Sequence, residues 1–218
     1  MSILAVSDEV DEALMGETRP ERLAGARLLI SCGDLPAEYL EFLVERFAIP
    51  LLYVRGNHDL RYGANPPPGE NIHCRLVTAA GLRILGFEGS IWYNGQGVQY
   101  TEREMWWKML WTVPSVCLAR GVDVIVTHAP PRGIHDGGDQ AHTGFSVFRK
   151  LLDVLRPRYF IHGHNHLSYV PKGARISAVG STQVVNAFRS TLLPIGVTSP
   201  STQEAGSAAH DAPQIQGV

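Results

Sequence analysis

The chain has 218 residues and a mass of 23.9 kDa, which is enough for one well-buried core and short for two independent domains. Charged residues make up 18% of the sequence and the formal net charge is -2, so the composition argues against a nucleic-acid-binding protein. No apolar stretch reaches the roughly 20 residues that cross a bilayer, and we expect no membrane contact.

The three cysteines, Cys32, Cys74 and Cys117, lie far apart without a Cys-x-x-Cys spacing. This pattern argues against both a disulfide framework and a thiolate zinc site. The N-terminus has no basic residues before its short apolar run, so we expect no signal peptide. These features predict a cytoplasmic protein.

Short runs rich in Val, Ile and Leu predict strands that are buried on both faces. They cover residues 3–6, 28–31, 51–54, 84–87, 122–127, 159–161 and 183–186. Apolar residues at helical spacing predict helices across residues 40–47 and 148–155. A third helix is predicted to begin at Thr101, where Thr-x-x-Glu has the spacing of a capping box. This alternation predicts an α/β domain over residues 1–195 with a largely parallel sheet.

Three further segments carry separate predictions. Asn94-Gly95 predicts a β-hairpin and therefore some antiparallel pairing. Residues 105–111 would surround their helix with apolar surface, which favours core packing but also fits a subunit contact in a homo-oligomer. From residue 196 the chain is rich in Ser, Ala, Gly, Gln and Pro, and we expect a flexible tail over 196–218.

Five of the predicted strands run into Asp, Asn or His. These stretches read "LAVSDEV", "LLISCGDL", "LLYVRGNHD", "VIVTHAPP" and "YFIHGHNH". The carboxyl ends of strands form the ligand crevice in open α/β sheets, so the five endings are expected to meet at one place.

The polar residues of these endings form a donor set of oxygens and nitrogens without thiolate. They are Asp8, Asp34, Asn57, His128, His164 and His166. This chemistry suits Mn, Fe, Zn or Ni. Six donors exceed one tetrahedral site and fit two divalent metals about 3.5 to 4 Å apart with one bridging carboxylate. His162 still lies inside its strand and is assigned to packing or to a supporting contact.

The same stretches resemble the five ordered motifs of the calcineurin-like metallophosphoesterases. The resemblance spans residues 8 to 166 and implies a four-layer α/β/β/α sandwich whose two mixed sheets hold a dinuclear site at their strand ends. It assigns Asp8 and His166 to one metal, and Asn57, His128 and His164 to the other. It makes Asp34 the bridge and His58 the unligated catalytic histidine.

The chain departs from the family pattern at two motifs. The first motif is usually Asp-x-His, but Val10 stands in place of the histidine, so the first metal site is expected to be weak or empty. Glu9 and Asp11 are candidates to replace the missing ligand. The second motif lacks the usual partner of the catalytic histidine, for which Asp59 or Glu38 could substitute.

The predicted function is hydrolysis of a phosphate ester by a metal-activated hydroxide, with His58 protonating the leaving group. On an extended chain, His58 projects away from its neighbour Asn57 and can face the substrate. Two divalent metals, two carboxylates and one hydroxide leave a charge of roughly +1, which favours a phosphodiester monoanion. Mn is the favoured metal, and family analogy points to cyclic nucleotides as one substrate class.

The segment "GIHDGGDQAHTG" supplies two further candidates, His135 and His142, as substrate-binding residues on an exposed loop. Two rival functions remain open. Val10 fits a scaffold that keeps the fold, has lost hydrolysis and binds partner proteins, whereas the retained His58 argues for an enzyme. A DNA nuclease fits less well because the chain is not basic.

Overall fold

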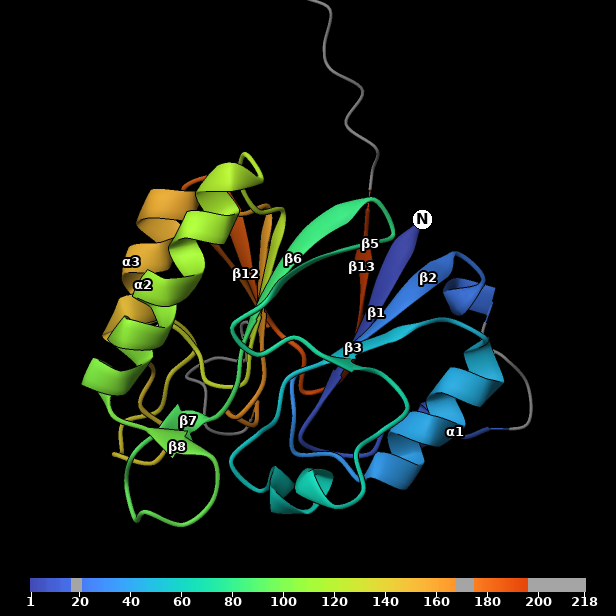
Figure 1. Cartoon of the computed structure of the whole chain (residues 1–218). Helices are drawn as coiled ribbons and strands as arrows, with labels where there is room; N and C mark the ends of the chain where they lie inside the picture. The colour runs from blue at the N-terminus through green and yellow to red at the C-terminus, as the bar shows by residue number, and fades with distance from the viewer. Residues whose placement is uncertain (17–20, 168–174, 196–218) are drawn as a thin grey trace, which may run out of the picture.

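Two β-sheets pack face to face, with helices against their outer faces (Figure 1). The computed structural model describes residues 1–16, 21–167 and 175–195, so the predicted tail lies outside the described residues. The first sheet has the order β13 (Arg189–Pro194), β1 (Ser2–Ser7), β2 (Ala26–Ser31), β3 (Leu51–Tyr53), β4 (Glu70–Asn71). The second has the order β11 (Ile176–Val179), β12 (Thr182–Asn186), β10 (Tyr159–His162), β9 (Val124–Thr127), β6 (Leu82–Phe87), β5 (Leu76–Ala79).

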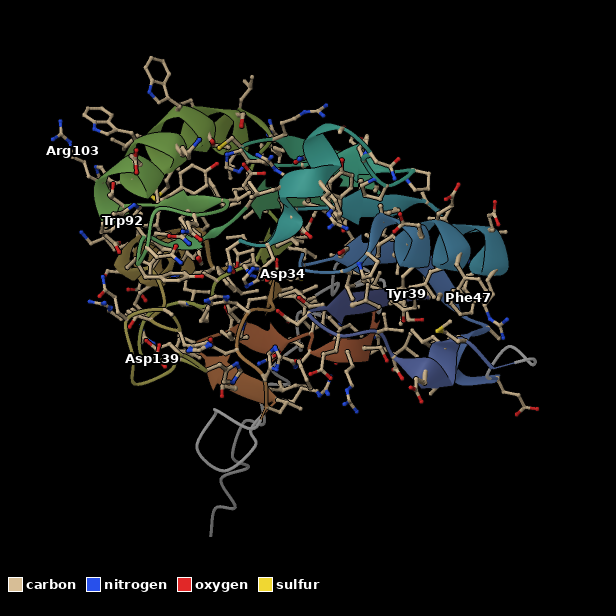
Figure 2. All side chains as sticks on the ribbon, turned by 90° about the horizontal axis from the view of Figure 1, so that it is seen from below. Asp34, Tyr39, Phe47, Trp92, Arg103 and Asp139 are labelled. Atoms are coloured by element: carbon tan, nitrogen blue, oxygen red, sulfur yellow. The ribbon has the colours of Figure 1, made fainter. Side chains whose placement is uncertain are left out.

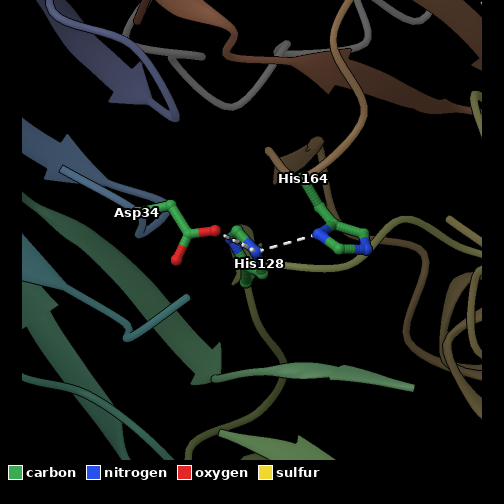
Figure 3. Close-up of side chains that lie close together, drawn as sticks. All are labelled: Asp34, His128 and His164. Atoms are coloured by element: carbon green, nitrogen blue, oxygen red, sulfur yellow. Dashed lines mark hydrogen bonds and ion pairs between the residues drawn. The ribbon is translucent and has the colours of Figure 1, made fainter. Parts of the chain in front are cut away.

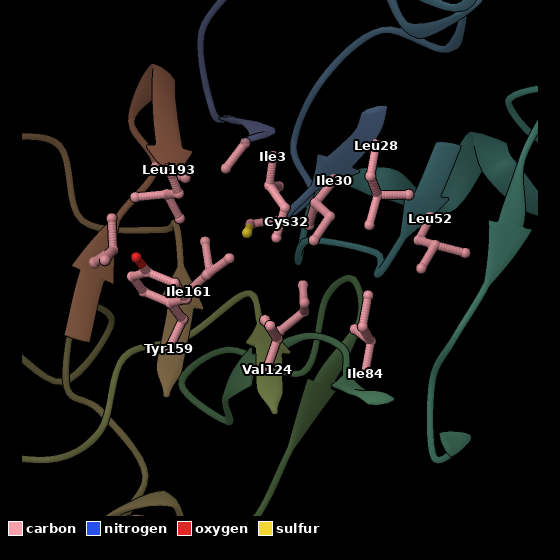
Figure 4. Packing of buried hydrophobic residues seen from close by; sticks show 14 of the residues in the cluster. Ile3, Leu28, Ile30, Cys32, Leu52, Ile84, Val124, Tyr159, Ile161 and Leu193 are labelled. Atoms are coloured by element: carbon pink, nitrogen blue, oxygen red, sulfur yellow. The ribbon is translucent and has the colours of Figure 1, made fainter. Parts of the chain in front are cut away.

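The predicted strands are confirmed, and their burial on both faces explains their continuous apolar sequences. Between the sheets, Ile3 and Ile30 of the first pack in one cluster with Ile84, Val124 and Ile161 of the second (Figure 4). The opposite faces of the same strands pack against helices. A strand enclosed in this way has no polar side to present, so the period-2 alternation of a half-exposed strand is lost.

The helices form the two outer layers. Helix α1 (Ala37–Phe47) covers the first sheet with Leu40, Leu43 and Phe47. Helices α2 (Glu102–Leu118) and α3 (Ser146–Leu155) cover the second sheet (Figure 1). The fold is therefore the α/β/β/α sandwich that was predicted. Among the helices of the described residues, none has the length and apolar character that a membrane span requires.

The capping box at the start of α2 is confirmed. The Glu104 backbone N–H donates to Thr101 Oγ1 over 3.2 Å, and the Thr101 N–H donates to Glu104 Oε2 over 2.8 Å. One face of this helix is buried through Met105 and Met109, while Trp107 and Trp111 are 52% and 83% exposed. The apolar character therefore does continue around the helix, and a subunit contact there stays a prediction.

The predicted hairpin at Asn94-Gly95 is wrong. Strands β7 (Ser90–Ile91) and β8 (Gln99–Tyr100) pair in parallel. The loop between them closes on the Gln99 side chain, whose Oε1 accepts the backbone N–H groups of residues 93, 94 and 95. This cap replaces the cross-strand bonds of a two-residue turn, so the chain makes a wide loop and returns in the same direction.

Antiparallel pairing occurs elsewhere, at the sheet edges. Strand β13 pairs antiparallel with β1, β5 with β6, and β11 with β12. The central strands are parallel: β1, β2 and β3 in one sheet, and β6, β9, β10 and β12 in the other. Both sheets are mixed, and the parallel strands bring their carboxyl ends to one edge of the sandwich.

Candidate metal centre

Four side chains from four strand ends meet at that edge. Asp34 follows β2, Asn57 follows β3, His128 follows β9 and His164 follows β10. His128 Nε2 lies 3.1 Å from His164 Nδ1 and 3.4 Å from Asp34 Oδ2 (Figure 3). The same nitrogen lies 2.9 Å from Asn57 Oδ1. We call these four residues the closed half of the centre. Asp34 itself lies near the middle of the molecule when it is seen from this edge (Figure 2).

Backbone carbonyls fix which nitrogen of each imidazole faces the centre. His128 Nδ1 lies 2.8 Å from the Cys32 carbonyl, and His164 Nε2 lies 2.7 Å from the Ala141 carbonyl. A carbonyl only accepts, so each ring donates from that nitrogen and turns a lone pair on its other nitrogen inward. Lone pairs from two imidazoles, an amide oxygen and a carboxylate therefore point at one another. Only a cation or a shared proton makes such an arrangement favourable, so the residues fit a divalent metal.

The pKa shifts of the closed half indicate an ion pair between His128 and Asp34. Burial lowers the pKa of His128, but the neighbouring Asp34 carboxylate outweighs burial and raises the pKa to about 9. Burial opposes ionisation of Asp34, yet the charge and hydrogen bond of His128 lower its pKa to about 2. Burial and the charge of His128 lower the pKa of His164 to about 3. Without metal, the closed half thus pairs one protonated imidazole, His128, with the Asp34 carboxylate, while His164 stays neutral.

The backbone carries strain at three of the predicted ligand positions. Asp8, Asp34 and His164 have φ angles of 69°, 57° and 67°, in the left-handed region that few non-glycine residues adopt. Each such residue costs on the order of 1 kcal/mol, and such strain clusters at functional sites. The glycine before Asp34 is required for another reason: a Cβ on Gly33 would lie 2.2 Å from the Gly56 nitrogen.

Asp59 joins the two ligand loops from β2 and β3. Its Oδ2 accepts the backbone N–H of Asp34 over 2.8 Å and that of Gly56 over 2.7 Å. Burial and the nearby Asp34 carboxylate raise the pKa of Asp59 to about 6. Asp59 thus accepts hydrogen bonds from backbone groups and holds the loops that carry Asp34 and Asn57 in register. The sequence had instead offered it as a partner of the predicted catalytic histidine.

The other predicted metal ligands, Asp8 and His166, lie on a more open side. The Asp8 carboxylate accepts the His164 backbone N–H at 2.9 and 3.1 Å. His166 Nδ1 lies 3.4 Å from Glu9 Oε1. Within the described part of the chain, the compact group of three potential ligands comprises Asp34, His128 and His164, so Asp8 and His166 are not drawn together as closely.

A cavity of about 400 Å³ opens over both sides of the centre. It is lined by Asp8, Asp34, Asn57, His58, Tyr93, Ala141, His142, His164 and His166. Five of the six predicted ligands and the predicted catalytic histidine therefore line one cavity. The sixth, His128, is fully buried behind them, in contact with Asp34 and His164. Tyr93 is the residue that sequence reasoning missed, and its hydroxyl accepts a hydrogen bond of 3.3 Å from Asn57 Nδ2.

His58 is the exposed histidine of the cavity, with 76% of its side chain accessible. The chain is not extended here, because His58 has right-handed helical dihedrals and begins a 3-10 turn, η3 (Asp59–Gly63). Its Nε2 lies 4.0 Å from Asp34 Oδ2, and its backbone N–H donates to Asp34 Oδ1 over 2.8 Å. His58 thus borders the predicted metal ligands without joining them.

The two loop histidines, His135 and His142, lie in different environments. His142 lines the cavity and donates from Nδ1 to Asp139, 2.8 Å away. His135 is buried and is not among the cavity's lining residues, because its ring contacts His162 Nε2 at 2.9 Å and Ser177 Oγ at 2.8 Å. His162 is buried as predicted, and its Nδ1 donates to the Gly163 carbonyl.

Comparisons with known proteins show the family to which the chain belongs. A sequence profile described as calcineurin-like phosphoesterase matches residues 13–168, which include the closed half, His58 and His166 but not Asp8. The human and mouse proteins named metallophosphoesterase domain-containing protein 1 are each 26% identical over 211 residues, covering 78% of this chain. The match covers 62% of each relative, so the chain spans less than two thirds of their length.

Solved structures support the fold. The crystal structure of the protein TT1561 from Thermus thermophilus superposes with a TM-score of 0.58 and 18% identity. The superposition covers 86% of this chain and 88% of that one. At this level of identity the similarity concerns the architecture alone.

Proposed function

Because the chain belongs to the calcineurin-like phosphoesterase family, we propose that it is a metal-dependent phosphoesterase that hydrolyses a phosphodiester. The observation that carries the proposal is the set of inward lone pairs from His128, His164, Asn57 and Asp34. These groups would hold one divalent cation, and Asp8, Asp34 and His166 would contribute to a second. Manganese is the favoured metal.

Cations bound there would lower the pKa of water and neutralise charge on the phosphoryl oxygens. The protein's own part is to orient the substrate and to move one proton. His58 can protonate the leaving oxygen, because it faces the cavity and is not consumed as a ligand. His142, oriented by Asp139, lies on the same cavity and would contact the phosphoryl group.

A second cavity of about 470 Å³ adjoins the first and shares Asp34 and His58 with it. A leaving group that accepts its proton from His58 would extend into this cavity. The walls combine the buried side chains of Leu35 and Tyr62 with the polar side chains of Arg61 and Asn65. Such a lining suits an organic group with both apolar and hydrogen-bonding parts, and a diester supplies one on each side of phosphorus. Cyclic nucleotides are the class to screen first.

The test is hydrolysis of bis(p-nitrophenyl) phosphate with Mn²⁺ by the wild type and by His58→Ala. We expect kcat to fall about 10²- to 10⁴-fold with unchanged metal content, since only the proton donor is lost. Leu60→Ala is the matched control, because Leu60 is the exposed neighbour in the same turn and should keep the full rate. Full activity in His58→Ala would refute the role of His58.

One rival function has support from two observations. Val10 replaces a family ligand, and Trp107 and Trp111 expose an apolar face that a partner protein could cover. A scaffold that has lost catalysis would bind little metal. Metal analysis of the purified protein separates the two functions: a stoichiometry well below one ion per chain favours the scaffold.

A further inference from the structure

Val10 cannot serve as a metal ligand, and its side chain packs against the apolar cluster beneath α1. From the matched family positions, a cation on that side would have only Asp8, Asp34 and His166. Any further protein ligand must come from a residue whose donor atom faces these groups. The two acidic neighbours in the sequence, Glu9 and Asp11, can be compared directly in the structure.

Asp11 is committed elsewhere. Its Oδ1 accepts the backbone N–H of Ala13 over 3.0 Å and so caps a 3-10 turn, η1 (Glu12–Leu14). Its other oxygen accepts a hydrogen bond from the Ser190 hydroxyl. Both oxygens of Asp11 therefore already have hydrogen-bond partners, and neither partner is a predicted metal ligand.

Glu9 has its two oxygens divided between two different neighbours. Oε2 accepts from Arg189, with Nε at 3.0 Å and Nη2 at 2.9 Å. Oε1 lies 3.4 Å from His166 Nδ1. One oxygen is thus held by a guanidinium while the other faces a predicted metal ligand, as is common for carboxylates whose second oxygen is fixed by a supporting residue.

The spacing of these two atoms matches a shared ion. Two ligand atoms about 2.1 Å from a tetrahedral metal lie about 3.4 Å apart, and the octahedral spacing is about 3.0 Å. Glu9 Oε1 and His166 Nδ1 therefore stand at the distance that two ligands of one cation require. Asp8, between β1 and Glu9, places a further carboxylate at the same strand end.

We propose that Glu9 replaces the missing first-motif histidine as a metal ligand through Oε1, with Arg189 holding its other oxygen. This inference rests on the proposed dinuclear phosphoesterase site. We call Asp8, Glu9, His166 and Arg189 the open half of the centre. The ion it takes is a divalent metal that accepts oxygen and nitrogen ligands, such as Mn²⁺. The positive charge of Arg189 makes this ion bind more weakly than the one in the closed half.

The experiment measures manganese binding to the metal-free protein, by stoichiometry after equilibrium dialysis and by electron paramagnetic resonance of the bound ions. The wild type should take up two ions per chain and show the spectrum of a coupled pair. Glu9→Gln should retain one ion, lose the coupled spectrum, and bind the second at least about tenfold more weakly. Retention of the first ion shows that the variant is folded.

Glu12→Gln is the matched control, since Glu12 is an exposed carboxylate in the same segment and should leave both ions in place. Two tightly bound ions in Glu9→Gln, or only one in the wild type at saturating Mn²⁺, would overturn the inference. If the protein still hydrolysed its substrate, these results would refute Glu9 as a ligand but leave the proposed function standing. Conversely, a Glu9-dependent second ion without hydrolysis would refute the proposed function and keep the ligand.

Discussion

The two halves of the centre differ in how their ligands are held. In the closed half, His128 and Asn57 are 0% and 2% exposed, and carbonyls of the main chain fix the imidazoles. In the open half, the side chains of Glu9 and His166 are 39% and 36% exposed, and an Arg189 side chain that is 59% exposed holds Glu9. An exposed ion pair typically contributes only about 0 to 1 kcal/mol to stability, so it holds its side chains weakly.

This contrast indicates that folding preorganises one half of the centre for metal binding, whereas metal binding itself must order the other half. Folding of the two sheets already brings the closed half together, and the strained φ angles at Asp34 and His164 form part of its cost. The open half must restrain exposed side chains when the ion binds, which weakens binding. We therefore expect a tight and a weak ion, and an activity that follows the supply of the weak one.

The largest effect should come from Asp34→Asn, because Asp34 is the proposed bridge between the ions of the two halves. Loss of its charge removes the ion partner of His128 and the bridge between the cations. We expect hydrolysis to fall at least about 10³-fold and both ions to be lost at micromolar manganese. Rate assays and dialysis on the same sample measure this. Two bound ions in this variant would show that the halves do not share Asp34.

Asp59→Ala should break the closed half alone. The substitution leaves two backbone N–H groups without their acceptor, and each such loss costs about 1 to 3 kcal/mol. The Asp34 and Asn57 loops then separate, and we expect the tight ion to bind about 10- to 100-fold more weakly. Calorimetric titration provides the measurement, and Asp59→Asn, which keeps one acceptor oxygen, is the control. Equal, unchanged affinities in both variants would contradict this role.

The last prediction concerns pH. The pKa of His128 is raised from 6.5 to about 9, so the metal-free folded protein holds a proton that the unfolded chain releases. The protonated His128 therefore stabilises the metal-free folded state. This contribution to the free energy of unfolding is fully present below pH 6.5 and is lost as the pH rises toward 9. Since the tight ion must displace this proton, its affinity should instead rise about tenfold per pH unit from 6.5 to 8.5. Melting curves of the metal-free protein test the predicted loss of stability with rising pH, and metal titrations test the predicted gain in affinity. If neither stability nor affinity changed across this range, the prediction would be contradicted.

The residues of the closed half could be predicted from the sequence because each one follows directly after a recognisable strand. Asp34, Asn57, His128 and His164 each follow a buried apolar run, and parallel strands within a sandwich bring such ends together. Strand β13 was missed because it is an edge strand that begins Arg-Ser-Thr and ends in Pro194, a pattern far from that of a buried strand. Without β13, nothing in the sequence places Arg189 beside Glu9, 180 residues away.

The supporting contacts were beyond sequence reasoning for a similar reason. The carbonyls of Cys32 and Ala141 have no side-chain signal, although they decide the tautomers of His128 and His164. His135 was predicted to bind substrate from an exposed loop, but its partners His162 and Ser177 lie 27 and 42 residues away. Only the tertiary packing shows that its ring is buried.

The most direct measurement is anomalous diffraction from crystals of the wild-type protein soaked with Mn²⁺. The strongest peak should lie among Asp34 Oδ2, Asn57 Oδ1, His128 Nε2 and His164 Nδ1, with a weaker peak between Glu9 Oε1, Asp8 and His166. A map without a peak among the first four atoms would contradict the account of this centre.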